Sequence, residues 1–145
     1  MELTVDIVTP ATNETNCRYT AINMLAGTWV WHTSFIPGHQ VESVVLGVAA
    51  GSRVTSFDVA SLDSSSEYQM CVEEVAADGT VGATLVAWKH FGMYSGIGFF
   101  MLRKYTPATI AVETTATRFK VSVRHTVSFN DSTGVAIFRP TGVAA

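Results

Sequence analysis

The longest regular alternation of apolar and polar residues in the chain runs from Phe119 to Phe129. Its apolar positions share one parity and are Phe119, Val121, Val123, Val127 and Phe129, with His125 completing the row. Strict alternation is typical of a strand that buries one face and exposes the other, whereas a helix would scatter these residues around its circumference. The pattern therefore predicts a two-sided strand of antiparallel sheet.

Shorter segments of similar character occur along the whole chain, separated by Gly, Pro, Asn, Asp and Ser. The further predicted strands are Leu3–Val8, Cys17–Leu25, Thr28–Phe35, Val41–Ala50, Arg53–Ala60, Glu67–Val75, Thr84–Lys89, Ile97–Arg103, Ile110–Thr114 and Val135–Arg139. Val41–Ala50 also matches helical spacing, but its β-branched residues favour a strand, with a short helix as the alternative. Pro10–Asn16 and Ser61–Ser66 are expected to be loops, and Asp78-Gly79 to form a tight hairpin.

These strands recur at roughly the 8–12-residue spacing of sandwiches and barrels. The absence of an internal repeat argues against propellers and solenoids, and the absence of a helical period between strands argues against βαβ units. We expect an all-β chain of about ten short strands, folded over residues 1–145 as one antiparallel, jelly-roll-like β-sandwich. Because the chain starts directly in a strand, this domain fits an excision from a longer chain.

Charged residues make up only 14% of the chain, while hydrophobic residues make up 48%; ordinary soluble domains have roughly 25% charged residues. Such a chain either exposes neutral surface that meets a partner or stays soluble through its hydroxyl groups, and composition leaves both open. The net charge of −3 and the absence of Lys/Arg runs argue against nucleic-acid binding. No segment approaches the roughly 18 apolar residues of a membrane span, and the acidic start is not that of a signal peptide.

Side chains that could carry catalysis do not gather in the sequence. The histidines show no metal-ligand spacing; they are His32, His39, His90 and His125. The aspartates in or beside predicted turns are expected to cap their own backbone; they are Asp58, Asp63, Asp78 and Asp131. Gly92–Gly96 has its serine one place away from the hydrolase spacing. We therefore predict no catalytic, metal or cofactor site, and no enzyme.

Cys17 and Cys71 are the only cysteines of the chain. Two distant thiols could form one bridge in an oxidising compartment. Cysteines inside strands more often act as small buried hydrophobes, and that is the expectation here.

Trp29 and Trp31 share one face of the predicted strand Thr28–Phe35. Exposed together, two indoles would form a flat platform on which a sugar ring can stack. Buried, they would be large core residues, which is the commoner fate of such a pair. The pair is the first candidate ligand site.

Arg118, Lys120 and Arg124 occupy the polar parity of the strand described first. Opposed by Glu67 and Glu73 of another strand, they would form cross-strand charge pairs. Unopposed, they would form a basic stripe able to hold a carboxylate or sulfate. A solvated sheet face is the preferred interpretation, and the stripe is the second candidate ligand site.

A charge-poor sandwich of this size and strand rhythm, rich in Thr, Ser, Val and Ala, resembles the protruding domain of small RNA virus capsid proteins of the nodavirus and tombusvirus type. The resemblance covers most of the chain without a diagnostic motif. It implies a non-enzymatic domain at the virion surface that forms a homodimer or homotrimer and attaches to a host cell-surface glycan or receptor.

The alternative is a carbohydrate-binding module or small lectin, secreted or extracellular, that uses Trp29 and Trp31. The capsid interpretation is preferred because low charge density is a property of the whole chain, while the tryptophan pair is one local feature.

Overall fold

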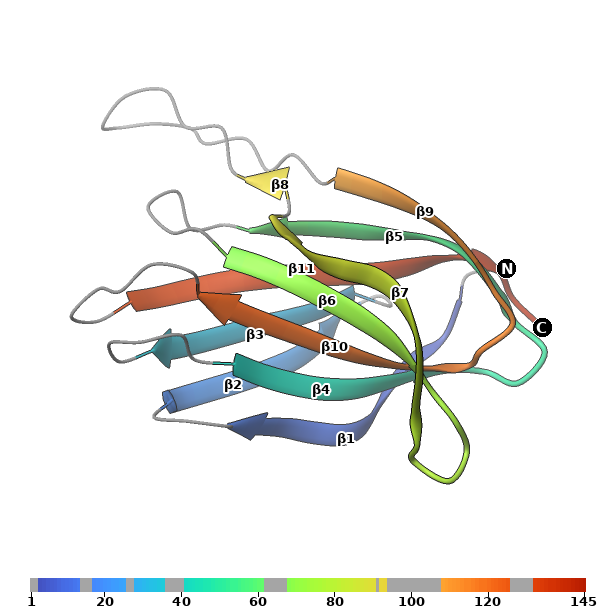
Figure 1. Cartoon of the computed structure of the whole chain (residues 1–145), viewed down its shortest axis with the longest axis horizontal. Coiled ribbons are helices and arrows are strands. Elements are labelled where there is room, and N and C mark those ends of the chain that lie inside the picture. Colours follow the sequence, from blue (N-terminus) through green and yellow to red (C-terminus); the bar gives the residue numbers. More distant parts are fainter. Residues whose placement is uncertain are drawn as a thin grey trace.

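Two stacked β-sheets form the part of the chain that the computed structural model describes, residues 3–13, 17–25, 28–35, 41–61, 68–90, 92–93, 108–125 and 132–145 (Figure 1). The strands are β1 (Val5–Asn13), β2 (Cys17–Leu25), β3 (Thr28–Phe35), β4 (Val41–Val48), β5 (Arg53–Ser61), β6 (Tyr68–Val75), β7 (Val81–His90), β8 (Gly92–Met93), β9 (Ala108–Thr114), β10 (Arg118–His125) and β11 (Ser132–Val143).

One sheet has the order β1-β4-β10-β6-β7, and we refer to it as the β10 sheet. The other, the β5 sheet, has the order β2-β3-β11-β5-β8, with β9 also paired to β5. Every pairing is antiparallel except the short one between β5 and β8. The predicted all-β, antiparallel sandwich is confirmed. Within the described segments, no helix has the length and apolar character to cross a membrane.

Individual strands agree with the sequence patterns to different degrees. Val41–Val48 is a strand, so the helical alternative is wrong there. The loop expected over Pro10–Asn16 is wrong in its first part, because β1 continues to Asn13; residues 14–16 lie outside the described residues. β1 is an edge strand whose register with β4 shifts twice, and such irregular edges tolerate proline. The predicted strand Ile97–Arg103 lies outside the described residues.

β10 is the central strand of its sheet, with β4 on one side and β6 on the other. Phe119, Val121 and Val123 are fully buried, as their alternation predicts. Their neighbours in the core include Val44 and Leu46 of β4 and residues of the other sheet. The odd-numbered positions of β10 therefore face the core, and its even-numbered positions face outward.

Phe57 of β5 connects the two sheets. Its ring meets that of Phe119 edge-on, with 5.4 Å between centroids, and lies 5.0 Å from the ring of Phe138 in β11. All three side chains are completely buried. Edge-to-face contacts of this kind add to the hydrophobic gain of burying large rings.

The turn between β6 and β7 closes as a tight hairpin, as Asp78-Gly79 predicts. The Ala76 amide donates to the Thr80 carbonyl, and Gly79 has a φ of 91°, which glycine adopts without strain. Asp78 Oδ1 accepts from the Thr80 amide at 2.9 Å, and this bond lowers the pKa of Asp78. The expected capping role of Asp78 is confirmed.

Phe57→Ala should lower the free energy of unfolding by about 3–5 kcal/mol, since it removes a buried ring and leaves a cavity between the sheets. Urea denaturation followed by tryptophan fluorescence measures the loss. The control is Val143→Ala, because Val143 is 54% exposed and its truncation should change stability by less than about 0.5 kcal/mol. Equal losses in the two variants would contradict the bridging role of Phe57.

Candidate functional site

The outward side of the β10 sheet brings together charged, polar, thiol and aromatic side chains of the described residues. Register places Lys120 opposite Glu73 and Val45, Ser122 opposite Cys71 and Ser43, and Arg124 opposite Gln69. Residues directly opposite each other share a face. We refer to this surface as the β10 face; its residues are Ser43, Val45, Gln69, Cys71, Glu73, Trp88, Arg118, Lys120, Ser122 and Arg124.

Arg124, Gln69 and Trp88 form one connected group on the β10 face. Arg124 Nε and Nη2 both donate to Gln69 Oε1, at 2.9 and 2.7 Å. The same guanidinium lies over the Trp88 ring, with Cζ 4.2 Å from the ring centroid. A guanidinium at this distance is attracted by the ring quadrupole. Arg124 thus reaches from β10 across β6 to β7.

A bulge in β7 explains why Trp88 lies on the β10 face. Register pairs Met70 with Lys89 but Val72 with Val86, so Ala87 and Trp88 together oppose the single residue Cys71. A bulge re-aims the side chains that follow it. Simple alternation would have put Trp88 on the buried parity of Val86, which is why the sequence pattern did not single it out. Gln69 was missed because its role depends on Arg124.

Small side chains form the floor beneath these long ones. Ser43 and Ser122 are buried and share a hydrogen bond of 2.8 Å between their hydroxyls. Cys71 beside them is a free, buried thiol, as expected for a cysteine within a strand. Burial is the main cause that raises its pKa; Glu73 raises it further, while Arg124 and Lys120 oppose the increase.

The three cations of the second candidate site, Arg118, Lys120 and Arg124, lie along β10 on the β10 face. Lys120 opposes Glu73, one of the two partners of the charge-pair alternative, although no ion pair joins them in the described contacts. The other expected partner, Glu67, lies outside the described residues. Arg118 opposes Gly47 and donates to the Ala77 carbonyl at 3.4 Å. Whether the stripe binds a ligand stays a prediction.

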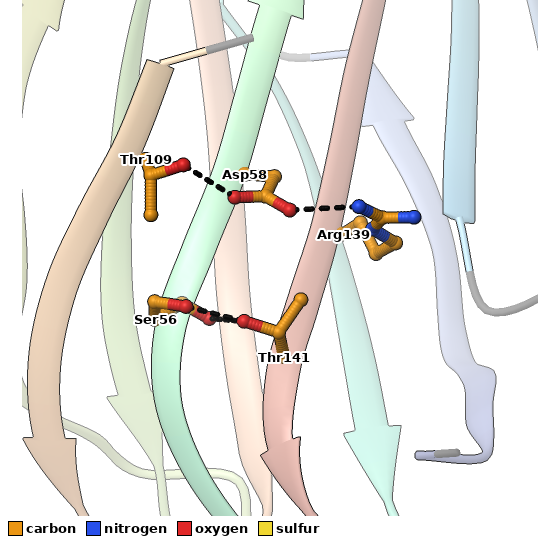
Figure 2. A network of polar contacts seen from close by, with 5 residues as sticks. All are labelled: Ser56, Asp58, Thr109, Arg139 and Thr141. Atoms are coloured by element: carbon orange, nitrogen blue, oxygen red, sulfur yellow. Dashed lines mark hydrogen bonds and ion pairs between the residues drawn. The ribbon is translucent and has the colours of Figure 1, made fainter.

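The outward side of the β5 sheet differs, because its polar groups satisfy one another (Figure 2). Asp58 Oδ1 accepts from Thr109, and Oδ2 pairs with Arg139 at 2.9 Å. Ser56 and Thr141 are hydrogen-bonded in the next row. The expectation that Asp58 lies by a turn is wrong, since it lies within β5. Both carboxylate oxygens of Asp58 are therefore already engaged within this network.

A pocket of about 550 Å³ opens where β5, β9 and β6 meet, lined by residues 53–55, 112–115 and Glu74. Glu74 Oε1 accepts from the Thr114 hydroxyl at 2.6 Å, and that hydroxyl accepts from the Ala116 amide. No histidine or cysteine lines the pocket. Throughout the described residues, no three His, Cys, Asp or Glu side chains gather in a way that could hold a metal ion.

Trp29 and Trp31 lie in β3, and their side chains are outside the described set. Register pairs Trp29 with Phe138 and Trp31 with Ala136 of β11. Because opposed residues share a face, position 29 lies on the same face of the β5 sheet as Phe138, whose side chain is buried. The structure therefore does not bring this pair together with the basic stripe, and the tryptophan platform stays a prediction.

Carbohydrate-binding modules are among the solved structures whose fold is similar to that of this chain. A β-sandwich carbohydrate-binding module, from work on the promiscuous specificity of such modules, matches with a TM-score of 0.48 and 10% identity over 94% of this chain. This chain spans 57% of that structure's length. A family 29 module complexed with mannohexaose gives 0.42 and 12%, covering 98% of this chain and 94% of that one.

A third neighbour is the module TmCBM61 in complex with beta-1,4-galactotriose, with a TM-score of 0.41 and 9% identity over 93% of this chain and 88% of that one. No protein-family model matches the sequence, and no curated protein does. Identities and TM-scores this low do not transfer a function.

The expected resemblance to capsid protruding domains is wrong, because these neighbours are carbohydrate-binding modules. That resemblance was based on composition and on the spacing of short strands, which many hydroxyl-rich sandwiches share. The expected capsid function and host attachment are therefore wrong as well. The homo-oligomer and the location, virion surface or extracellular, are untested.

Cys71 should react with a thiol reagent about tenfold or more slowly in the folded protein than in urea, since only an accessible thiolate is nucleophilic. A Cys17→Ser background isolates its signal, and release of the chromophore from Ellman's reagent measures the rate. Ala145→Cys in the same background provides an exposed thiol for comparison. Equal rates for Cys71 and position 145 would contradict the burial.

The raised pKa also gives stability a pH dependence. Because the folded thiol titrates above its ordinary value of 9.0, its neutral form contributes to stability below that value. This contribution to the free energy of unfolding is lost as pH rises through the folded pKa. Urea denaturation at several alkaline pH values should therefore show a smaller decrease in the free energy of unfolding for Cys71→Ala than for the wild type.

Proposed function

We propose that this chain is a non-enzymatic carbohydrate-binding module that holds a glycan against the β10 face. The observation that carries the proposal is the Trp88–Arg124–Gln69 group, in which an indole, a guanidinium and an amide are held together on the outward side of one sheet. The β10 face supports this function independently of the structural neighbours.

Sugars present both kinds of surface that this group matches. The C–H groups of a pyranose ring pack against aromatic side chains, and its hydroxyls both donate and accept hydrogen bonds. On the β10 face, Trp88 supplies apolar surface and is half-buried. Arg124 Nη1 makes no hydrogen bond among the described contacts and can donate to a hydroxyl oxygen. Glu73, which lies further along the β10 face opposite Lys120, can accept from one.

The group is also held in place before any ligand arrives. Two hydrogen bonds to one amide oxygen and the stacking on Trp88 limit the rotamers of Arg124. Binding then sacrifices less side-chain entropy, which for a long side chain amounts to about 0.5–1.5 kcal/mol. By contrast, the ordered network on the β5 sheet uses its polar groups internally.

Trp88→Ala should weaken glycan binding about tenfold or more, because loss of an aromatic contact and its buried area removes at least about 1.4 kcal/mol. Affinity electrophoresis in native gels containing mannan, galactan, hydroxyethyl cellulose or polygalacturonate measures binding through retardation. Gln69→Ala should give a smaller loss, since it frees Arg124 without removing it.

Val143→Ala on β11 serves as the matched control and should migrate as the wild type does. A Trp29→Ala/Trp31→Ala variant tests the alternative platform. If the Trp29→Ala/Trp31→Ala variant lost binding while Trp88→Ala kept it, the binding site would lie at β3 instead of on the β10 face. If no polymer retarded the wild-type protein, the proposed function would be overturned. Thermal unfolding of each variant separates loss of binding from loss of fold.

A further inference from the structure

The basic residues of this chain are concentrated on one strand of the β10 face. The protein has nine Lys and Arg residues against twelve Asp and Glu, with a net charge of −3. Three of the nine, Arg118, Lys120 and Arg124, lie on the outward side of β10 within seven consecutive positions. A chain that is acidic as a whole therefore presents a row of positive charge along the centre of one sheet.

The strands on both sides of this row are mostly neutral. On β4, register places Gly47, Val45 and Val41 opposite the three cations in turn. On β6, Gln69 opposes Arg124, and Glu73 opposes Lys120. Asp6 of β1 also pairs with Gly47, from the far side of β4.

The described carboxylates beside the row, Glu73 and Asp6, are two against three cations, and neither forms an ion pair with them in the described contacts. Arg124 is bonded to an uncharged amide oxygen, and Arg118 to a backbone carbonyl. Lys120 makes no ion pair in the described contacts. All three side chains are half-buried rather than fully solvated, and partial burial strengthens their attraction for an anion relative to bulk water.

We infer that the β10 face selects acidic glycans, polysaccharides carrying carboxylate or sulfate groups, with Arg118 and Lys120 as the residues that set this specificity. The inference rests on the proposed function. Trp88 and Arg124 contact the sugar whether or not it is charged, and the other two cations of the row bind its carboxylate or sulfate groups. Charge-assisted hydrogen bonds to carboxylate or sulfate are the stronger class of polar contact.

The length of the row indicates a polymer rather than a single sugar. Same-face residues on a strand lie about 7 Å apart, so Arg118 and Arg124 are separated by roughly 20 Å. Several linked sugar units are needed to meet both ends at once. A small anion could occupy only one of these positions.

The test compares charged polymers with neutral counterparts of the same linkage and length. Polygalacturonate is paired with its carboxyl-reduced form, and chondroitin sulfate with a desulfated, carboxyl-reduced form. At low salt, wild type should bind one charged polymer about tenfold or more tightly than its counterpart, as expected for a few charge-assisted contacts. Raising sodium chloride should weaken that preference, because exposed charges are screened.

Lys120→Gln and Arg118→Gln should each weaken charged-polymer binding about three- to tenfold and weaken binding to the neutral counterpart by a smaller factor. Arg53→Gln is the matched control: it removes the same charge from an exposed residue of the β5 sheet and should have no effect. Isothermal titration calorimetry measures each affinity.

Each outcome distinguishes the alternatives. Equal binding of charged and neutral polymers would overturn the inference and leave the proposed function intact, whereas binding of neither polymer would count against both. An equal loss in Arg53→Gln would show non-specific attraction, which also overturns it. Competition by inorganic sulfate beyond that of sodium chloride at equal ionic strength would indicate a single-anion site instead of a polymer site.

Discussion

The contact of Phe57 with Phe119 and Phe138 fixes how the two sheets face each other. These rings come from β5, β10 and β11, and all are fully buried. Because side chains alternate along a strand, holding Phe119 inside obliges Arg118 and Lys120 to point outward, and the same constraint extends to Arg124. A one-residue slip of β10 would exchange the faces and bury the cations. The β10 face therefore depends on the aromatic contact between the sheets, although none of its own side chains takes part in it.

The β10 face combines long polar side chains with an unusually small floor. Ser43, Ser122 and Cys71 lie in neighbouring strands at the same level, and each is buried. Because the two serine hydroxyls bond to each other, each of these two buried groups has a partner. Small residues at this level leave room for Arg124 to lie across β6 and stack on Trp88. Larger residues there would fill the space that the guanidinium crosses. The position of the Arg124 guanidinium over Trp88 therefore depends on the small side chains beneath it as well as on the length of Arg124 itself.

Sequence patterns predicted the parts of this arrangement that depend on local alternation. They placed the buried and outward sides of β10 correctly and identified its three cations, because that strand is regular and central. They also predicted the hairpin at Gly79 from its turn chemistry.

They did not predict the face of Trp88, because one extra residue in β7 reverses the parity beyond Val86. Nor could they predict that Gln69 and Trp88 meet Arg124, since the order β10-β6-β7 is a long-range property. The expected loop after Pro10 failed for a related reason: only the sheet order shows that β1 is an edge strand that can accept proline.

The composition of the chain and the register of its strands give different descriptions of how its charges are distributed. Averaged over the chain, 14% charged residues and a net charge of −3 describe a nearly neutral, slightly acidic surface, and that average is what suggested a capsid domain. Register shows that the charges are unevenly placed. On the β5 sheet Asp58 and Arg139 pair and largely cancel, while on the β10 face three cations lie beside two described carboxylates, Glu73 and Asp6, without an ion pair in the described contacts. Since an electrostatic interaction falls with distance and with screening over about 10 Å, a ligand at the β10 face responds to that local row rather than to the net charge. The binding preference of such a protein is therefore set by which strands pair, and composition alone does not predict that pairing.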